Sequence, residues 1–281
     1  LALHRAAAEA LGPRLAEAAP GARLALYDSE GALTLGGAPA RAEETEVDLL
    51  WLSPHVLRAG ADRGAALAAA FDLMHRLRRL GALETFNAGL DDPRYAALAA
   101  KGVAIQNSSA QGIAIAEYVM AQVLALTQPI LRQRELQAAR RWEVTPFREL
   151  SRTHWLILGW GPIGRAVAAR ARAFEARVSV VRRSPEGTEG ADRAGTLADL
   201  PALLPEADVI VLACPLTEAT RGVVGPDFLA AVKPGAILVN VARGGLIARE
   251  ALLAALDAGR LSAAVLDVFE TEPPPAEDPL W

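Results

Sequence analysis

Short apolar runs alternate along the chain with longer segments of helical periodicity. Such a run is typical of a buried parallel strand, whereas a longer amphipathic segment predicts a helix. The strands expected on this basis are 22–27, 47–52, 83–86, 103–106, 155–158, 178–181, 207–213, 236–241 and 262–268. The expected helices are 1–19, 64–80, 95–100, 111–127, 130–141, 163–174, 225–231 and 249–258. This alternation predicts the α/β class with parallel sheets.

The elements fall into two series, which predict two doubly wound parallel-sheet domains. Residues 1–106 form the first series, and a polar cluster at 107–109 precedes a long helix, so we expect the second domain to comprise residues 107–281. An α/β domain ordinarily opens with a strand, and a helix comes first here, so an earlier strand is expected to be missing. The 111–127 helix is apolar on more than one face, which is typical of a helix buried between domains or subunits.

Composition narrows the class of protein. The chain has 281 residues, a formal net charge of −4 and a single cysteine, Cys214. A weakly acidic chain does not attract nucleic acid, and its apolar stretches are shorter than the ~20 residues that cross a bilayer. One cysteine allows neither a disulfide framework nor a cysteine-based zinc site, so no metal is expected. We therefore expect a cytoplasmic protein that binds neither nucleic acid nor membrane.

A glycine-rich turn joins the apolar run 155–158 to the 163–174 helix. The turn reads Gly159-Trp160-Gly161-Pro162-Ile163-Gly164. The G-x-G-x-x-G spacing between a strand and a helix is the dinucleotide-binding fingerprint, although an ordinary strand-to-helix turn is the alternative. The first glycine would make the tight turn, the second would let the backbone approach a pyrophosphate, and the third would let the helix pack on the strand. The pyrophosphate would lie at the helix N-terminus.

The next strand ends in cations where NAD-specific proteins place an acidic residue. Arg182-Arg183-Ser184 follows the apolar run 178–181. An acidic residue there would hold the ribose 2′-hydroxyl, whereas arginine accommodates a 2′-phosphate. One or two charge-assisted hydrogen bonds of about 1.5–3 kcal/mol would set a preference of roughly tenfold to several hundredfold. We expect NADP(H) as the preferred cofactor, with NAD(H) also able to bind. Solvated arginines at a strand end are the alternative.

Four motifs follow one another over the C-terminal two-thirds of the chain. They are the glycine turn 158–164, CPLTEAT at 214–220, KPGAILVNVARGG at 233–245 and LDVFETEP at 266–273. Together they resemble the D-isomer-specific 2-hydroxyacid dehydrogenases, and the glycine turn with the double arginine most resembles the glyoxylate/hydroxypyruvate reductase branch. The resemblance implies a flavodoxin-like substrate domain and a Rossmann NAD(P)-binding domain. It also implies a homodimer that transfers hydride between NAD(P)H and a small 2-oxo acid, most readily hydroxypyruvate or glyoxylate.

The resemblance also implies roles for the matching residues. Arg243, at the carboxyl edge of a strand, would bind the carboxylate and carbonyl of a 2-oxo acid through its planar guanidinium. Glu272 matches the catalytic glutamate that pairs with an imidazole and raises its pKa. Backbone N–H groups of Ala88-Gly89-Leu90 would hold the substrate carboxylate, and Asp267 would contact the nicotinamide carboxamide. Further cofactor-lining positions are the glycine turn, residues 182–184, Cys214 as a small apolar residue, Pro215, Thr220, Val241 and Ala242.

These assignments have plainer alternatives. Arg243 could be a surface arginine, Asp267 and Glu272 solvated turn carboxylates, and residues 88–90 an ordinary glycine turn. A nucleotide-sensing binding module, like the co-repressor relatives of the family, is a second interpretation, and a catalytically inactive paralogue is a third. A pure binding module would need neither Arg243 nor Glu272. The sequence does not identify the 2-hydroxy acid, because the side chains that select it are scattered over the first domain.

The family's proton-donating histidine would lie beyond Trp281. The four histidines present are His4, His55, His75 and His154. His4 and His75 fall in helical patterns among arginines and are expected to be solvated, and His154 precedes the nucleotide-binding strand, at the wrong end for the site. His55 follows a first-domain strand and is the best-placed substitute. We expect instead that the gene product continues past Trp281 and supplies both the histidine and a helix that returns to the first domain; a stop codon directly after Trp281 would contradict this.

Overall fold

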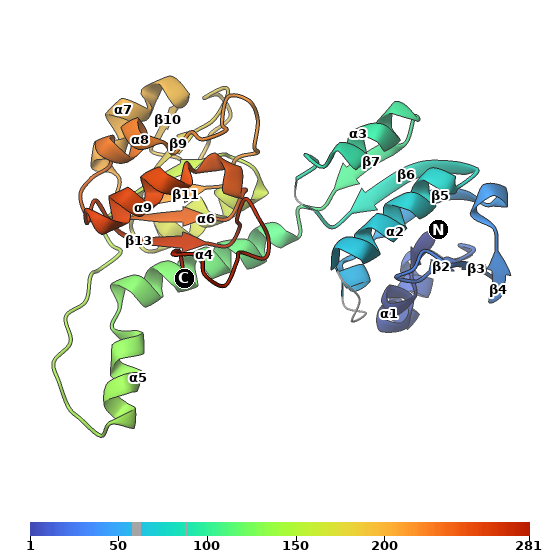
Figure 1. Ribbon diagram of the computed structural model, residues 1–281, viewed down its shortest axis with the longest axis horizontal. Helices are drawn as coiled ribbons and strands as arrows, with labels where there is room; N and C mark the ends of the chain where they lie inside the picture. Colours follow the sequence, from blue (N-terminus) through green and yellow to red (C-terminus); the bar gives the residue numbers. More distant parts are fainter. Residues whose placement is uncertain (58–62, 88) are drawn as a thin grey trace. The chain divides into compact units, whose positions relative to one another are not determined.

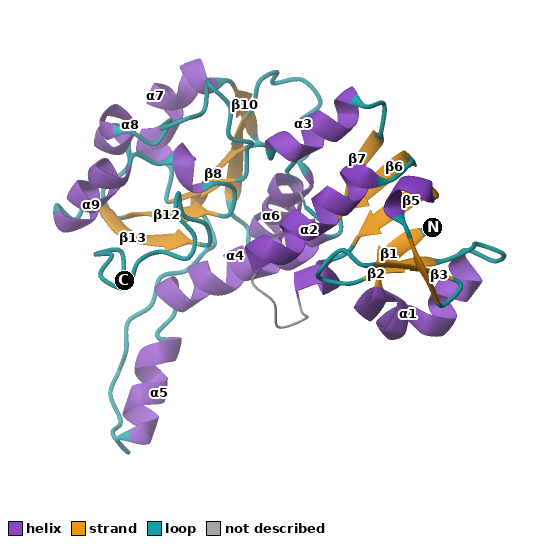
Figure 2. Cartoon of the chain, turned by 45° about the vertical axis from the view of Figure 1, so that its right-hand side comes forward, coloured by secondary structure: helices purple, strands orange, loops and turns teal. Residues whose placement is uncertain are grey.

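The computed structural model describes residues 1–57, 63–87 and 89–281. The chain divides into two compact units, Leu1–Ala110 and Gln111–Trp281. Each unit is a largely parallel sheet with helices packed on it (Figures 1 and 2), so the predicted pair of α/β domains is confirmed. The division falls a few residues past the predicted boundary at 106, because the Ser108 N–H still donates to the Thr85 carbonyl (3.0 Å).

The first unit, over its described residues, holds a sheet in the order β4-β3-β2-β1-β5-β6-β7. The strands are β1 (Ala2–His4), β2 (Ala25–Tyr27), β3 (Leu33–Leu35), β4 (Ala38–Ala40), β5 (Glu46–Leu52), β6 (Arg79–Thr85) and β7 (Ala104–Asn107). The helices are α1 (Arg5–Ala18), α2 (Arg63–Arg76) and α3 (Pro93–Ala100). All neighbouring strands pair in parallel except in the β2-β3-β4 part, which is antiparallel.

The beginning of the chain differs from the prediction. Ala2, Leu3 and His4 form a buried strand between β2 and β5, and the helix starts only at Arg5. The predicted helix 1–19 was therefore wrong over its first residues, and the strand expected to be missing is present. Three residues are too few for periodicity to separate them from the alanine-rich helix that follows, so only pairing with two neighbouring strands reveals β1.

His4 is buried, contrary to the prediction that it is solvated. Its side chain is 3% exposed, its Nδ1 accepts the Ala6 N–H (3.3 Å), and its Nε2 lies 3.1 Å from Ser29 Oγ. An Nδ1 that accepts leaves the proton on Nε2, which then donates to Ser29. Burial lowers the pKa of His4, with Asp28 opposing this shift and His55 adding to it. The ring is thus a neutral cap of α1.

The β3–β4 hairpin was not predicted. Its turn is Gly36-Gly37, with φ of 60° and 86°. Positive φ at both central residues is typical of the type I′ turn that joins two-residue hairpins, and glycine adopts it without strain. The paired glycines between two short runs were the signal in the sequence.

The second unit holds, over residues 111–281, a parallel sheet in the order β10-β9-β8-β11-β12-β13. The strands are β8 (His154–Leu158), β9 (Arg177–Val181), β10 (Arg193–Gly195), β11 (Val209–Leu212), β12 (Ala236–Asn240) and β13 (Leu261–Leu266). The helices are α4 (Gln111–Thr127), α5 (Ile130–Ala138), α6 (Pro162–Ala173), α7 (Leu200–Leu203), α8 (Pro226–Ala231) and α9 (Arg249–Asp257). The predicted elements are confirmed with shifts of a few residues at their ends, and β10 and α7 are additions.

Both faces of this sheet are covered, which explains why its strands are mostly apolar. Trp155 and Ile157 of β8 pack into one core with α4 and α6, whereas Leu156 and Leu158 pack into the other core. Alternate side chains of a strand point to opposite faces, so a strand buried on both sides is apolar except where a polar side chain is paired, as Ser179 of β9 is with His154 (2.7 Å). With both faces covered, a site must lie at an edge of the sheet, where the strands end in loops.

Helix α4 belongs to the hydrophobic core of the second unit that also contains Trp155 and Ile157. Its side chains at Ala116, Val119, Met120 and Val123 are buried, and the helix packs against α6. In the described part of the chain no single helix is long and apolar enough to cross a membrane; α4 and α5 meet that test only when counted together across a 61° bend.

Candidate nucleotide-binding and active site

The carboxyl ends of four neighbouring strands of the second unit carry the predicted residues. The strands β8, β11, β12 and β13 lie side by side in this order and run parallel. The chain continues from β8 to β9 on one side of β8, and β11 lies on the other side. The order in which strands are added therefore reverses at β8. Ligands of open α/β sheets bind in the crevice at such a switch point.

Two of the three glycines in the turn after β8 are required by packing. Gly159 has φ of +110°, and a Cβ placed on it would lie 2.5 Å from the Ala213 carbonyl oxygen. Gly164 lies so close to the Gly159 carbonyl oxygen that a Cβ there would overlap it. The tight turn and the close approach of helix to strand are therefore as predicted.

Gly161 is different, because nothing lies within 4 Å of the position that its Cβ would take. It is the N-cap of α6, and the Arg165 N–H makes the first helical hydrogen bond, to the Gly161 carbonyl (3.0 Å). The N–H groups of Ile163 and Gly164 precede that bond and can donate to an anion. Open space at the cap beside these donors fits the pyrophosphate of a dinucleotide. Trp160, 7% exposed, anchors the turn in the core.

The basic segment after β9 lies at the same edge of the sheet. The Arg182 guanidinium donates to the carbonyls of Glu186 (3.0 Å) and Gly187 (3.3 Å) and so holds the following loop. Arg183 is exposed and Ser184 is half-buried. Of the two arginines, Arg183 is thus the one whose guanidinium makes no hydrogen bond within the described part of the chain.

The segment after β11 forms a tight turn. Thr220 Oγ1 donates to the Pro215 carbonyl (2.8 Å) and accepts the Thr217 N–H (2.8 Å), so its hydroxyl closes the turn. Burial raises the pKa of the Cys214 thiol to about 11. The thiol is therefore neutral near pH 7, which agrees with its expected role as a small apolar residue and not a nucleophile.

The turn after β12 presents Arg243 and is organised by a residue that the sequence analysis missed. Asn240 is fully buried; its Oδ1 accepts the Ala242 N–H (3.0 Å) and its Nδ2 donates to the Arg243 carbonyl (2.9 Å). Val241 and Ala242 are buried, and Arg243 is partly exposed, with Nη1 donating to the Ala242 carbonyl (2.7 Å). A polar residue at the end of the apolar run 236–240 was the signal for Asn240.

The segments after β12 and β13 touch at Gly244. A Cβ on Gly244 would overlap the backbone of Phe269 and Glu270, so only glycine lets the two turns meet. The Asp267 N–H donates to the Asn240 carbonyl (3.0 Å), and the Phe269 N–H donates to Glu272 Oε1 (2.9 Å). Arg243, Asp267 and Glu272 therefore lie on two contacting turns.

Asp267 has an unusual environment for a carboxylate. Desolvation raises its pKa, and the negative charge of Glu272 adds to the rise. Its charge in turn raises the pKa of the Tyr118 phenol on α4, after the larger effect of burial. The two carboxyl groups and the phenol thus share one region at the edge of the sheet.

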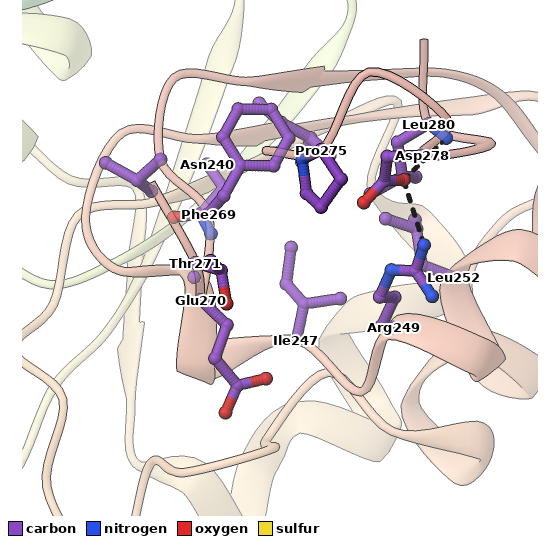
Figure 3. A pocket seen from close by; sticks show the side chains of 13 residues that line it. Asn240, Ile247, Arg249, Leu252, Phe269, Glu270, Thr271, Pro275, Asp278 and Leu280 are labelled. Carbon is purple, nitrogen blue, oxygen red and sulfur yellow. Dashed lines mark hydrogen bonds and ion pairs between the residues drawn. The ribbon is translucent and has the colours of Figure 1, made fainter. Parts of the chain in front are cut away.

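A cavity of about 350 Å³ lies on one side of these turns. Apolar side chains form much of its wall, and Figure 3 shows them around the opening: Ile247, Leu252, Phe269, Pro275 and Leu280. The Arg249 guanidinium pairs with Asp278 (2.9 Å) at the rim, so both of these charges are satisfied within the wall. The cavity offers space beside the Arg243 turn, and the exposed Glu270 carboxylate also lines it.

The predicted substrate loop belongs to the first unit. Ala88 lies outside the described residues, Gly89 is half-buried, and Leu90 is exposed. The chain before them is held by the buried Tyr95, whose hydroxyl lies 2.8 Å from Thr85 Oγ1 and accepts Asn87 Nδ2 (2.6 Å). The sequence pattern does not single out Tyr95 as this anchor. Tyr95 holds Asn87 at the carboxyl end of β6, the edge at which parallel sheets bind ligands.

The histidines differ in their suitability as proton donors. His154 begins β8, at the amino edge of its sheet; it is buried beside Ser179 (Nε2 to Oγ, 2.7 Å), and burial lowers its pKa. His75 lies in the last turn of α2. His55 is half-buried after β5, with Nδ1 3.3 Å from Ser53 Oγ. His154 is thus excluded from a site at the carboxyl edge. In the described residues no group of three His, Cys, Asp or Glu side chains could hold a metal.

Comparison with known proteins finds matches over most of the chain. Residues 120–281, more than half of the chain, match the family model described as D-isomer specific 2-hydroxyacid dehydrogenase, NAD binding domain. The hydroxypyruvate reductase of Thermotoga maritima is 34% identical over 76% of this chain and 70% of its own length. A glyoxylate/hydroxypyruvate reductase B of Yersinia enterocolitica is 32% identical over 77% of this chain and 68% of its own. The matched region covers only 40% of the D-3-phosphoglycerate dehydrogenase of Methanocaldococcus jannaschii, at 34% identity.

A solved structure shows the same two-domain fold. The D-isomer specific 2-hydroxyacid dehydrogenase from Xanthobacter autotrophicus, crystallised with NADPH, is 28% identical and superposes with a TM-score of 0.76. The alignment covers 100% of this chain and 84% of that one.

Proposed function

The chain belongs to the D-isomer-specific 2-hydroxyacid dehydrogenase family, and we propose that it reduces a small 2-oxo acid, hydroxypyruvate or glyoxylate, with NADP(H) as the preferred cofactor. The observation that carries this proposal is the contact at Gly244, which sets Arg243 beside the segment 267–272 at the edge where the glycine turn also lies. The names of its relatives favour a reductase over a binding module.

The cofactor would be held by the turn 159–164 and by the ends of β9, β11, β12 and β13. Gly161 and the N–H groups of Ile163 and Gly164 would receive the pyrophosphate. Cys214, Pro215 and Thr220 would line the next part of the site with Val241 and Ala242, and Asp267 would accept the carboxamide. A bound nicotinamide cofactor supplies the hydride that the reaction needs, or accepts it in the reverse direction.

Arg243 would bind the substrate and polarise it. Its guanidinium offers donors in a planar fork that matches a carboxylate and an adjacent carbonyl oxygen. Because Asn240 fixes the backbone on both sides of Ala242, the base of this side chain is held in place before substrate arrives. The role of residues 88–90, to offer backbone N–H groups to a substrate carboxylate, stays a prediction.

Hydride that reaches carbon leaves negative charge on oxygen, so an acid must give a proton. Glu272, already fixed by the Phe269 N–H, would hold and polarise the imidazole of that acid. The first assay is oxidation of NADPH by the product of the complete gene with hydroxypyruvate, glyoxylate and, as a control, a 2-oxo acid with a bulky side chain. Turnover with the small acids is expected; binding of NADPH without turnover of any of them would contradict the proposal.

The preference for NADP(H) is expected to depend mainly on Arg183. The Arg182 guanidinium is engaged by two backbone carbonyls, which leaves Arg183 as the exposed cation for the 2′-phosphate. Arg183→Ala should raise the Kd for NADPH about tenfold and leave that for NADH unchanged, since one charge-assisted hydrogen bond contributes roughly 1.5 kcal/mol or more. Fluorescence titration of both cofactors measures this. Arg183→Lys keeps the charge and should retain part of the preference; equal losses for both cofactors in Arg183→Ala would contradict the assignment.

We propose a homodimer formed through α5 and the segment after it. Figure 1 shows this part of the second unit reaching away from its sheet. It carries large apolar side chains in solvent: Leu131 is 63% exposed, Trp142 96%, Val144 94% and Phe147 62%. Apolar surface of this kind, bordered by ion pairs such as Arg132–Glu143 (2.9 Å), is typical of an interface.

Replacing Trp142 and Val144 together with serine is expected to convert dimer into monomer. Both side chains are almost fully exposed, so the change removes apolar interface without opening a core. Sedimentation velocity gives the mass, and Phe174→Ser, a change of the exposed residue directly after α6, is the matched control. A monomeric parent protein, or a double variant that stays dimeric, would contradict the proposed interface.

The remaining partners follow from the sequence. The expected partner is a small 2-oxo acid, with no nucleic acid and no membrane. We propose the cytoplasm as the compartment, and recovery of the protein with membranes or outside the cytoplasm on cell fractionation would contradict it.

A further inference from the structure

The glycine turn lacks one of the donors that the start of a helix normally offers. Residue 162, the first of α6, is proline. Proline suits this position because its φ is already helical, but it has no N–H. An anion at this terminus can therefore accept hydrogen bonds from the N–H groups of Ile163 and Gly164, but none from Pro162.

Arg165 lies one turn into the same helix and reaches back to the turn. Its Nη1 donates to the Trp160 carbonyl (2.8 Å), the residue directly before Gly161. Side chains on a helix point towards its N-terminus, so this direction is the ordinary one for a residue of the first turn. A guanidinium carries five N–H donors, and this hydrogen bond is the one that the structure gives the Arg165 side chain within the described residues. The residue is exposed, so the remaining donors are accessible.

We propose that Arg165 binds the pyrophosphate of the cofactor and replaces the donor that Pro162 removes. The bond to Trp160 holds the guanidinium beside the turn, where the space next to Gly161 is open. A positive charge there adds to the field of the helix N-terminus, and charge-assisted hydrogen bonds to phosphate oxygens are the stronger kind. This inference rests on the proposed dinucleotide site and assigns to it a residue outside the glycine fingerprint.

The test measures cofactor binding by the Arg165→Gln variant. NADPH is titrated without substrate, and binding is monitored by fluorescence. The Kd is expected to rise about tenfold, the loss of one charge-assisted bond. Binding should also become less sensitive to salt, because one cation–phosphate contact has gone. Adenosine 2′-phosphate has no pyrophosphate, so its own affinity, measured by competition with NADPH, should be the same for the variant and the parent. Arg172→Gln is the matched control: this arginine lies on the same helix and pairs with Asp192 (3.1 Å).

The double variant Pro162→Ala/Arg165→Gln separates a pyrophosphate contact from a merely structural one. Alanine restores an N–H at the first helical position, so the double variant should bind NADPH more tightly than Arg165→Gln alone. If Arg165 only fastens the turn to Trp160, the melting temperature of the apo protein will fall in Arg165→Gln and in the double variant, whereas loss of a pyrophosphate contact leaves it unchanged. Unchanged NADPH binding by Arg165→Gln overturns the inference and leaves the proposed function intact; a parent protein that binds no NADPH overturns both.

Discussion

Arg243→Gln is expected to lower kcat/KM for reduction of a small 2-oxo acid by about 10²- to 10³-fold, with the Kd for NADPH unchanged. Removing one donor from a charge that develops in the transition state costs an enzyme about this much. The guanidinium would bind both the carboxylate and the carbonyl oxygen, so the loss should appear in kcat as well as in KM. The Kd for NADPH should not change, because the cofactor is assigned to the glycine turn and the strand ends around it.

Arg243→Lys and Arg193→Gln are the controls for this result. Lysine keeps the charge without the planar fork and should recover only part of the activity. Arg193 lies on β10 in an exposed ion pair with Glu206 (2.9 Å), and such pairs contribute little to stability, so its loss should leave kinetics unchanged. Steady-state kinetics of each variant measure its activity, and melting curves show whether a loss of activity comes from a loss of stability. Activity of Arg243→Gln within a few-fold of the parent would remove Arg243 from the proposed mechanism.

Gly164→Ala is expected to destabilise the apo protein by about 3 kcal/mol, because the added methyl group overlaps the Gly159 carbonyl oxygen. The helix must then move away from β8, and the turn that receives the pyrophosphate moves with it. Thermal unfolding without cofactor should show a clearly lowered melting temperature, and binding of NADPH should be lost with it.

Gly161→Ala is the matched variant with the opposite pattern. Nothing lies within 4 Å of its added Cβ, and its φ of −75° suits alanine, so the apo protein should keep its stability. The methyl group would instead stand where the pyrophosphate approaches, and the Kd for NADPH should rise about tenfold or more with the loss of one charged hydrogen bond. If Gly161→Ala binds NADPH as tightly as the parent, the dinucleotide does not lie at this turn.

The parts of the fold that could be predicted are those whose signals are local. A strand buried on both faces is almost entirely apolar, so β8, β9, β11 and β12 could be predicted from their apolar runs. The glycine turn could be predicted because strand, turn and helix follow one another directly in the sequence. Helix α4 was predicted with its observed bounds, Gln111–Thr127, since its apolar pattern is long.

The parts that could not be predicted depend on distant partners. Strand β1 has three residues and exists through its pairing with β2 and β5, which also buries His4. Asn240 is chemically conspicuous in an apolar run, but its role in shaping the turn around Ala242 needs the folded backbone. The same holds for Gly244: its need for close approach to Phe269 follows from the meeting of two turns that lie far apart in sequence. The roles of Arg243, Asp267 and Glu272, of the cofactor-lining residues and of residues 88–90 stay predictions.

The most direct test of the central claim follows the hydride itself. The product of the complete gene is incubated with NADPH deuterated at the transferring position of nicotinamide C4 and with hydroxypyruvate or glyoxylate, and the product is examined by mass spectrometry and NMR. The account predicts one deuterium at C2 of the 2-hydroxy acid and, with hydroxypyruvate, a product of D configuration. Oxidation that leaves no deuterium at C2, or no oxidation with either acid although NADPH binds, would contradict it.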